Sequence, residues 1–144
     1  AKTIRDRYRL PCLADDTGLE VDYLDGEPGV FSSRFAGEGC SYDDNNRKLL
    51  SLLEGVPAEK RSARFKTVIA FGDIDGEIQT VEGVLEGHIA TEPRGTFGFG
   101  YDPVFIVAAI NTTLAELPPE EKNRISHRGR ALAGIKTIII KAFA

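Results

Sequence analysis

Several residue types are scarce or absent in this chain of 144 residues. There is no Trp and no Met, and only two Cys and two His occur. The cysteines, Cys12 and Cys40, form no C-x-x-C pair and stand near no His at metal-binding spacing. This pattern is typical of a reduced protein, so we expect a cytoplasmic location.

Long apolar runs and basic blocks are also missing. The longest apolar run, at 104–110, and the run at 138–140 between Lys136 and Lys141 are both far too short to span a membrane. The chain has 18 basic and 22 acidic residues, for a net charge of -4, and no segment gathers the basic ones. We therefore expect neither a membrane nor a nucleic acid as partner. A few basic side chains in a cleft still suffice to bind a small phosphate compound.

The length and the hydrophobic content of 42% are those of one domain with a single core. Strand and helix patterns are mixed along the chain without repeats, which predicts one α/β domain over residues 1–144. The predicted elements are a helix at 2–9, a short buried strand at 12–14, a turn at 15–18, a strand at 19–23, a helix at 42–53, a hairpin of strands at 63–71 and 77–87, a short helix from 118 to before 126, and an amphipathic helix at 128–143.

Two adjacent carboxylates, Asp15 and Asp16, follow the first predicted strand. Such a pair can hold Mg²⁺, and one carboxylate can orient or deprotonate a water. Because successive strand residues point to opposite faces, we expect only one of the two to face a cleft. The alternative is a simple turn, since Asp and Gly dominate turns for steric reasons.

A glycine-rich aromatic loop spans residues 95–103. Its glycines let the backbone approach a ligand closely, while Phe97, Phe99 and Tyr101 offer flat faces on which a nucleobase can stack. The alternative is a core plug, in which these rings only pack against other side chains.

The run Ser126-His127-Arg128, with Lys122 one turn earlier, is a third candidate. Lys and Arg side chains only donate hydrogen bonds, so they suit the acceptor atoms of a phosphate or a base. The alternative is a helix cap by Ser126 followed by solvated charges.

The order of these motifs resembles the inosine triphosphate pyrophosphatase family. The matching runs cover nearly the whole chain in the same order as in the family. They are LADDTGLEV at 13–21, GVFSSRFAG at 29–37, NNRKLL at 45–50, GFGYDPVF at 98–105, Glu121-Lys122, and SHRGRAL at 126–132.

This resemblance implies an elongated two-lobed α/β fold around a mixed β-sheet with flanking helices, with the substrate cleft between the lobes. It also implies a homodimer and a Mg²⁺-dependent activity. The reaction would convert purine nucleoside triphosphates with altered bases, namely ITP, dITP and XTP, to the monophosphate and pyrophosphate, and so clean the nucleotide pool.

The resemblance also assigns roles to residues. Asp16 is expected to bind Mg²⁺ and to accept a proton from the attacking water, with Asp15 as a weaker metal ligand. Phe99 and Tyr101 are expected to sandwich the base. The expected substrate-binding residues are Thr17, Phe99, Gly100, Tyr101, Asp102, Lys122, Ser126, His127 and Arg128.

The sequence departs from the family pattern at its start. Family members begin with a strand and a phosphate-binding Ser/Thr-x-Asn-x-x-Lys loop, followed later by a metal-binding Glu, and neither has a counterpart here. We therefore expect this domain to lack the N-terminal strand, phosphate loop and helix. Two other hypotheses stay open: an inactive nucleotide-binding fragment, and a different phosphohydrolase that uses Asp15 and Asp16 as nucleophile and acid.

Overall fold

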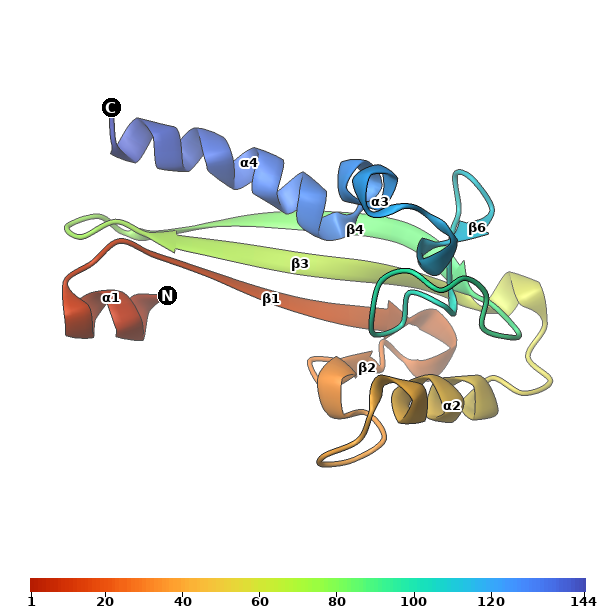
Figure 1. Ribbon diagram of the computed structural model, residues 1–144. Coiled ribbons are helices and arrows are strands. Elements are labelled where there is room, and N and C mark those ends of the chain that lie inside the picture. Colours follow the sequence, from red (N-terminus) through yellow and green to blue (C-terminus); the bar gives the residue numbers. More distant parts are fainter.

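The computed structural model describes residues 1–144 as a long sheet with one helix along a face and smaller elements gathered at one end (Figure 1). The six strands have the order β2-β1-β3-β4-β5-β6. The strands are β1 Cys12–Val21, β2 Pro28–Gly29, β3 Ser62–Gly72, β4 Ile78–Ile89, β5 Phe105–Val107 and β6 Thr112–Thr113. The α-helices are α1 Lys2–Tyr8, α2 Tyr42–Leu52, α3 Pro119–Ile125 and α4 His127–Ala142.

The predicted α/β class is confirmed, but the expected mixed sheet is not. All the strand pairings are antiparallel. A short hairpin at 73–77 joins β3 to β4, and antiparallel neighbours are what so short a connection permits. The longer connections, residues 22–61 between β1 and β3 and residues 90–104 between β4 and β5, also join antiparallel neighbours.

Strand β1 differs from the sequence prediction. The turn expected at 15–18 is absent, and β1 runs unbroken past it because every residue from Cys12 to Val21 has a partner on β3. Pairing with a long neighbouring strand overrides the turn preference of Asp and Gly. The expected burial at 12–14 is also wrong, since Leu13 is exposed. Gly18 has a specific reason to be glycine, because a Cβ there would lie 2.7 Å from the Gly29 carbonyl oxygen on β2.

Helix α4 packs against one face of the sheet. Along β3 the buried side chains alternate, which places one face against the core and α4. These buried residues are Ala63, Phe65, Thr67, Ile69 and Phe71. On β4, Gly83 lets the first turn of α4 approach closely, since a Cβ there would lie 2.0 Å from the His127 carbonyl oxygen. This contact fixes the start of α4 over the middle of the sheet.

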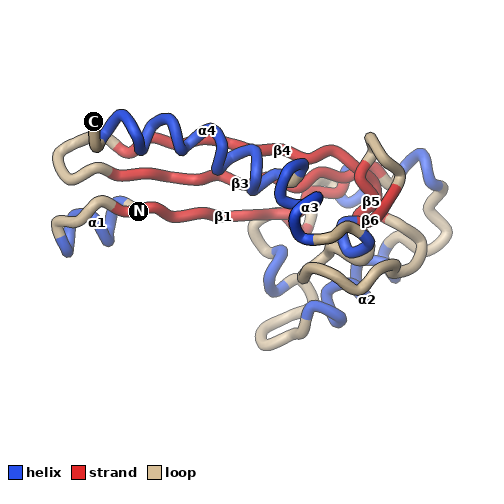
Figure 2. The backbone as a smooth tube through the Cα atoms, turned by 45° about the horizontal axis from the view of Figure 1, so that its top comes forward, coloured by secondary structure: helices blue, strands red, loops and turns tan.

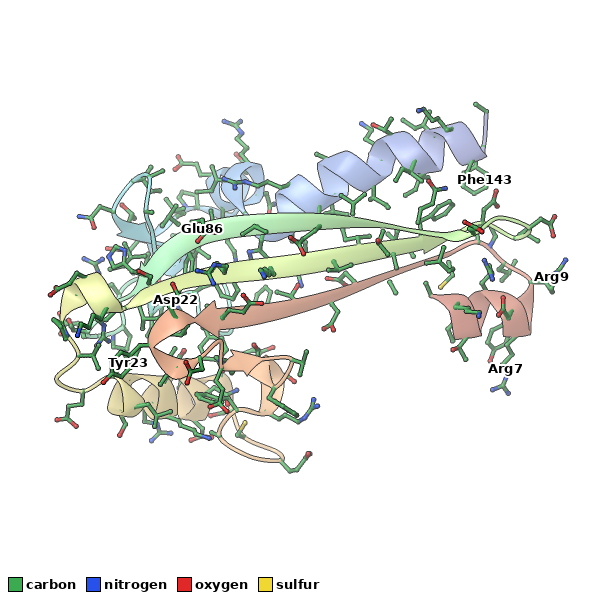
Figure 3. All side chains as sticks on the ribbon, turned by 180° about the vertical axis from the view of Figure 1, so that it is seen from behind. Arg7, Arg9, Asp22, Tyr23, Glu86 and Phe143 are labelled. Carbon is green, nitrogen blue, oxygen red and sulfur yellow. The ribbon has the colours of Figure 1, made fainter.

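The helix predictions at 2–9, 42–53, 118–125 and 128–143 are confirmed within one or two residues. The α1 helix lies at the far end of the sheet from α2 (Figure 2). Arg9 and Phe143 mark this far end, whereas Asp22 and Tyr23 lie toward the end that holds α2 (Figure 3). None of the helices is both long and apolar enough to cross a membrane.

Candidate active site

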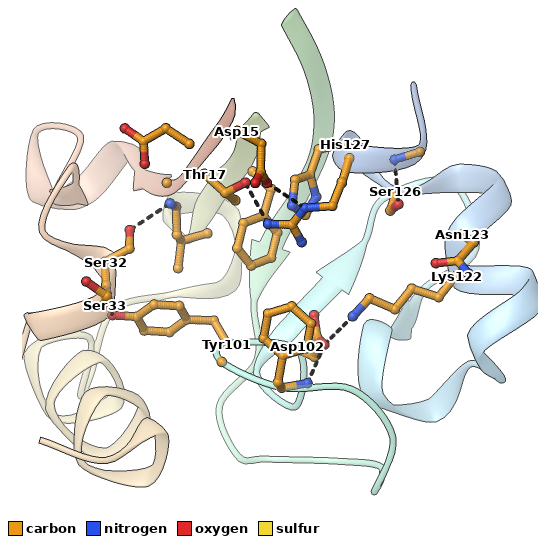
Figure 4. Close-up of a pocket in the computed structure, with 18 of the residues that line it drawn as sticks. Asp15, Thr17, Ser32, Ser33, Tyr101, Asp102, Lys122, Asn123, Ser126 and His127 are labelled. Atoms are coloured by element: carbon orange, nitrogen blue, oxygen red, sulfur yellow. Dashed lines mark hydrogen bonds and ion pairs between the residues drawn. The ribbon is translucent and has the colours of Figure 1, made fainter. Parts of the chain in front are cut away.

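With the exception of Phe97, all the residues that the sequence predicted for the site line one cleft, with a volume of about 720 Å³. The cleft lies between β1, the loop at 95–103 and the junction of α3 with α4. In Figure 4, Ser32 and Tyr101 lie on one side of it and Lys122 and Ser126 on the other. The predicted residues brought together are Asp15, Asp16, Thr17, Phe99, Gly100, Tyr101, Asp102, Lys122, Ser126, His127 and Arg128.

The junction between α3 and α4 sets one wall. Ser126 caps α4, and its hydroxyl oxygen accepts a hydrogen bond from the Gly129 backbone N–H at 3.0 Å. The capping role is therefore confirmed, and it coexists with a place in the cleft. Because the cap fixes where α4 begins, it also directs the two residues that follow, His127 and Arg128, toward the cleft.

His127 is buried and uncharged near neutral pH. Its ring stacks on Phe65 with 4.6 Å between centroids, and only 4% of the residue is exposed. Burial first, and then the nearby charges of Arg128, Lys122 and Arg130, lower the pKa of His127 to about 4. Its buried Nδ1 atom has no hydrogen-bond partner. A neutral ring at the cleft suits an uncharged base better than a phosphate.

Arg128 links α4 to β1 across the cleft. Its Nε atom donates to Asp15 Oδ2 at 2.9 Å, and its Nη2 atom donates to Thr17 Oγ1 at 3.1 Å. The Thr17 hydroxyl lies 2.6 Å from that of the fully buried Thr67 on β3. Arg128 is thus held in place by its two β1 partners, and its remaining Nη1 group is available for a ligand acceptor.

Asp16 is the carboxylate of the pair that has no basic partner. Asp15 pairs with Arg128, whereas Asp16 is exposed and joins no ion pair. Strand β2 pairs only with Leu19 and Glu20, so both carboxylates lie on an unpaired edge of β1. The expected strand end is therefore a strand edge, which leaves Asp16 open to ligands.

The cleft offers a metal ion few protein ligands. No three His, Cys, Asp or Glu side chains gather into a metal-binding group. A metal ion would therefore be held by Asp16, water and substrate oxygens, a coordination that Mg²⁺ commonly accepts in phosphate-binding sites.

The glycine-rich aromatic loop is held by Asp102. This buried carboxylate accepts a hydrogen bond from the Phe99 backbone N–H at 2.7 Å and from Lys122 Nζ at 2.5 Å. Gly98 has φ of 79°, and a Cβ there would collide with the Asp102 carboxylate. Lys122 Nζ also lies 4.7 Å from the centroid of the Phe99 ring, which is 55% exposed. The loop thus presents Phe99 to the cleft beside a cation.

Tyr101 lines the same cleft but belongs mainly to the core. The residue is 5% exposed, and its hydroxyl donates to the Ser32 carbonyl oxygen at 2.9 Å. Burial, and to a smaller extent the Cys40 thiol, raises the pKa of Tyr101, so the hydroxyl stays protonated. Little of this ring is free to stack on a ligand. The core-plug interpretation therefore describes Tyr101 well and Phe99 poorly.

Comparison with known proteins agrees with this geometry. The model of the Ham1 family matches residues 1–138. The chain belongs to the Ham1 family.

Its relatives in this family are named as nucleotide hydrolases. The dITP/XTP pyrophosphatase of Caldanaerobacter subterraneus subsp. tengcongensis is 59% identical over 143 residues, covering 98% of this chain and 70% of that protein. That of Thermoanaerobacter sp. is 56% identical over 142 residues, covering 98% of this chain and 71% of that protein. The resemblance inferred from the motifs is thereby confirmed.

Solved Ham1 structures share the fold. The Ham1 protein of Staphylococcus aureus superimposes with a TM-score of 0.92 at 38% identity, over 97% of this chain and 72% of that one. The HAM1 protein of Coxiella burnetii gives a TM-score of 0.86 at 47% identity, over 94% of this chain and 70% of that one.

Some residues of this Ham1-family cleft escaped the sequence prediction. Phe65 supplies the surface on which His127 stacks, and only the strand register across β3 reveals it. Tyr42 opens α2, where nothing in the local pattern separates a ligand contact from an exposed helix start. The other missed lining residues are Gly18, Leu19, Ser32, Ser33, Asn123, Gly129 and Leu132.

Proposed function

We propose that this protein hydrolyses deaminated purine nucleoside triphosphates, namely dITP, XTP and ITP, to the monophosphate and pyrophosphate. The observation that carries the proposal is the convergence of three chemistries in one cleft: the unpaired carboxylate of Asp16, the exposed ring of Phe99, and the donors of Lys122 and Arg128. The names of the Ham1-family relatives support the same activity.

The reaction divides between two parts of the cleft. The base lies on Phe99, near Lys122, His127 and Arg128, while the phosphates extend toward β1. Asp16 accepts a proton from the attacking water, whose oxygen becomes bonded to phosphorus as the bridge between the α- and β-phosphates breaks. Pyrophosphate leaves with the electron pair of that bridging bond. Mg²⁺, held by Asp16 when bound, would neutralise charge on the phosphates.

The hydrogen-bond donors of the cleft explain which purine base the protein prefers. Hypoxanthine and xanthine carry an oxygen at position 6, where adenine carries an amino group. The free Nη1 group of Arg128 can donate to that oxygen but not to an amino group. Leaving a buried donor unpaired costs about 1–3 kcal/mol, and several such donors increase the discrimination. Neutral His127 adds a second polar contact without attracting a phosphate.

We also propose that residues 1–144 act as one pyrophosphatase domain within a cytoplasmic homodimer. The motif resemblance supports this assembly. Sedimentation equilibrium tests it, since a monomer mass of 15.7 kDa at micromolar concentration would contradict it.

Product analysis tests the proposed reaction. The protein is incubated with dITP and Mg²⁺, and the products are separated by anion-exchange chromatography. We expect dIMP and pyrophosphate in equal amounts, and no product when EDTA removes the metal. Formation of dIDP and inorganic phosphate would contradict the proposed bond cleavage. Absence of turnover would favour an inactive nucleotide-binding protein instead.

A further inference from the structure

Tyr42, the first residue of α2, is a large aromatic side chain that the core does not bury. It lines the cleft, yet the residue is 56% exposed, and its hydroxyl makes no hydrogen bond. Its nearest aromatic neighbour is Phe99, with 6.2 Å between ring centroids and 41° between ring planes. Two large rings thus stand exposed side by side at the cleft. Such a pair leaves apolar area in water that a flat ligand would cover.

The position of Tyr42 is fixed by the helix that carries it. Ser41 caps α2, since its hydroxyl accepts from the Asp44 backbone N–H while the Asp44 carboxylate accepts from the Ser41 backbone N–H at 2.9 Å. One turn after Tyr42, the buried Asn46 donates its Nδ2 hydrogen to the Gly100 carbonyl oxygen at 3.0 Å. Residues four apart share one helix face. The same face of α2 therefore carries Tyr42 and, through Asn46, is hydrogen-bonded to Gly100, the residue next to Phe99.

The cations near Phe99 come from another part of the chain. Lys122 Nζ lies 4.7 Å and Arg128 Cζ 6.0 Å from the centroid of its ring, and both belong to the α3–α4 wall. Tyr42 approaches Phe99 from α2 instead. Phe99 thus lies between the cations of α3 and α4 and the aromatic ring of Tyr42 on α2. Tyr101 cannot supply the second exposed ring, because it is buried and its hydroxyl is bound to Ser32.

We infer that Tyr42 is a substrate-binding residue, which together with Phe99 forms the aromatic wall against which the purine base stacks. The inference rests on the proposed function for its substrate class, deaminated purine nucleotides. Because stacking of this kind is made equally in the bound substrate and in the transition state, Tyr42 is expected to affect KM rather than kcat.

The test compares three variants of the full chain: Tyr42→Leu, Tyr42→Phe and Tyr8→Leu. Tyr8 is also 56% exposed but lies on α1 between Arg7 and Arg9, which Figure 3 shows at the opposite end of the sheet from Asp22 and Tyr23, and it does not line the cleft. Pyrophosphate release from XTP is measured across substrate concentrations. We expect Tyr42→Leu to raise KM about tenfold with kcat nearly unchanged, and Tyr42→Phe and Tyr8→Leu to resemble the wild type. An unchanged KM in Tyr42→Leu would overturn the inference, as would an equal loss in Tyr42→Phe.

Binding of XMP, measured by isothermal titration calorimetry, separates this inference from the proposed function. If the wild type released no pyrophosphate but bound XMP, the proposed activity would fail, and the inference would stand only if Tyr42→Leu weakened XMP binding about tenfold. An equal Kd in the two proteins would overturn the inference. If the wild type neither turned over XTP nor bound XMP, both would be wrong. A melting temperature equal to that of the wild type confirms that Tyr42→Leu is folded.

Discussion

The two ends of the long sheet differ in what covers them. At the cleft end, a cluster of 15 buried apolar residues joins strands, α2 and the loop at 95–103, and it includes Leu19, Phe65 and Tyr101 from the cleft lining. At the other end, only four residues form the buried cluster beneath α4. They are Ile69, Phe71, Ala131 and Ile135. The site is therefore built on the larger part of the core, where packing and buried polar contacts fix its side chains.

This difference predicts that substitutions at the cleft end alter activity, whereas those at the other end do not. The largest effect is expected for Asp16→Asn, which keeps the shape of the side chain but removes the proton acceptor. We expect kcat for dITP to fall about 100-fold to 10,000-fold, the usual range for loss of a general base. Since Asp16 is exposed and unpaired, the melting temperature should not change.

Asp75→Asn is the matched control for Asp16→Asn, because Asp75 is exposed at the hairpin tip of the other end. It should leave kcat unchanged. Equal kcat values for Asp16→Asn and the wild type would remove Asp16 from the reaction.

The second prediction compares one buried side chain from each cluster. Leu49→Ala empties a site at the centre of the large cluster and should lower the free energy of unfolding by about 4 kcal/mol. Ile135→Ala lies in the small cluster, whose partly buried neighbours can collapse into the space, so about 2–3 kcal/mol is expected. Urea denaturation measures both. A larger loss for Ile135→Ala would reverse the comparison of the two ends.

The third prediction concerns the pH dependence of stability at the cleft end. His127 has a folded-state pKa of about 4, below its ordinary value of 6.5, because it is buried near cations. Below pH 6.5 the unfolded chain binds a proton at this residue that the folded chain does not bind. The free energy of unfolding therefore falls as the pH drops from about 6.5 to about 4, by about 3 kcal/mol from this group.

His127→Phe keeps a ring over Phe65 and removes the titrating group, so this share of the acid sensitivity should disappear. Urea denaturation at pH 7 and pH 4.5 measures it. The same loss of stability on acidification in both proteins would show that His127 is not its source.

Sequence patterns predicted the helices, the β3–β4 hairpin and the charged residues of the proposed site. Caps, prolines and hairpin turns are local signals, so their positions could be inferred from nearby residues. The continuity of β1 could not be predicted, because Asp15 to Gly18 have turn preferences that only the distant partner β3 overrides.

The same limit explains the aromatic residues of the cleft. Sequence spacing made Phe99 and Tyr101 look equivalent, yet one is exposed and the other is buried against Ser32. Tyr42 was missed because its nearness to Phe99 depends on a contact between Asn46 and Gly100, which are 54 residues apart. Contacts of this kind are set by the fold and leave no local pattern.

The smallest effect is expected for Arg128→Ala, which removes a base contact but no buried packing. We expect kcat/KM for dITP to fall about 10-fold to 100-fold, as for the loss of one or two hydrogen bonds to a ligand. Arg130→Ala, on the same helix but bonded to the Val84 carbonyl oxygen, is the control and should retain activity. An unchanged kcat/KM in Arg128→Ala would remove its role in reading the base.

The most direct test of the account is the rate of pyrophosphate release from XTP and from ATP at equal concentration, with Mg²⁺ present. A cleft that reads the oxygen at position 6 through Arg128 and its neighbours predicts release from XTP at least about 100-fold faster than from ATP. Equal rates for the two nucleotides would contradict the account, because the donors of the cleft would then play no part in choosing the substrate.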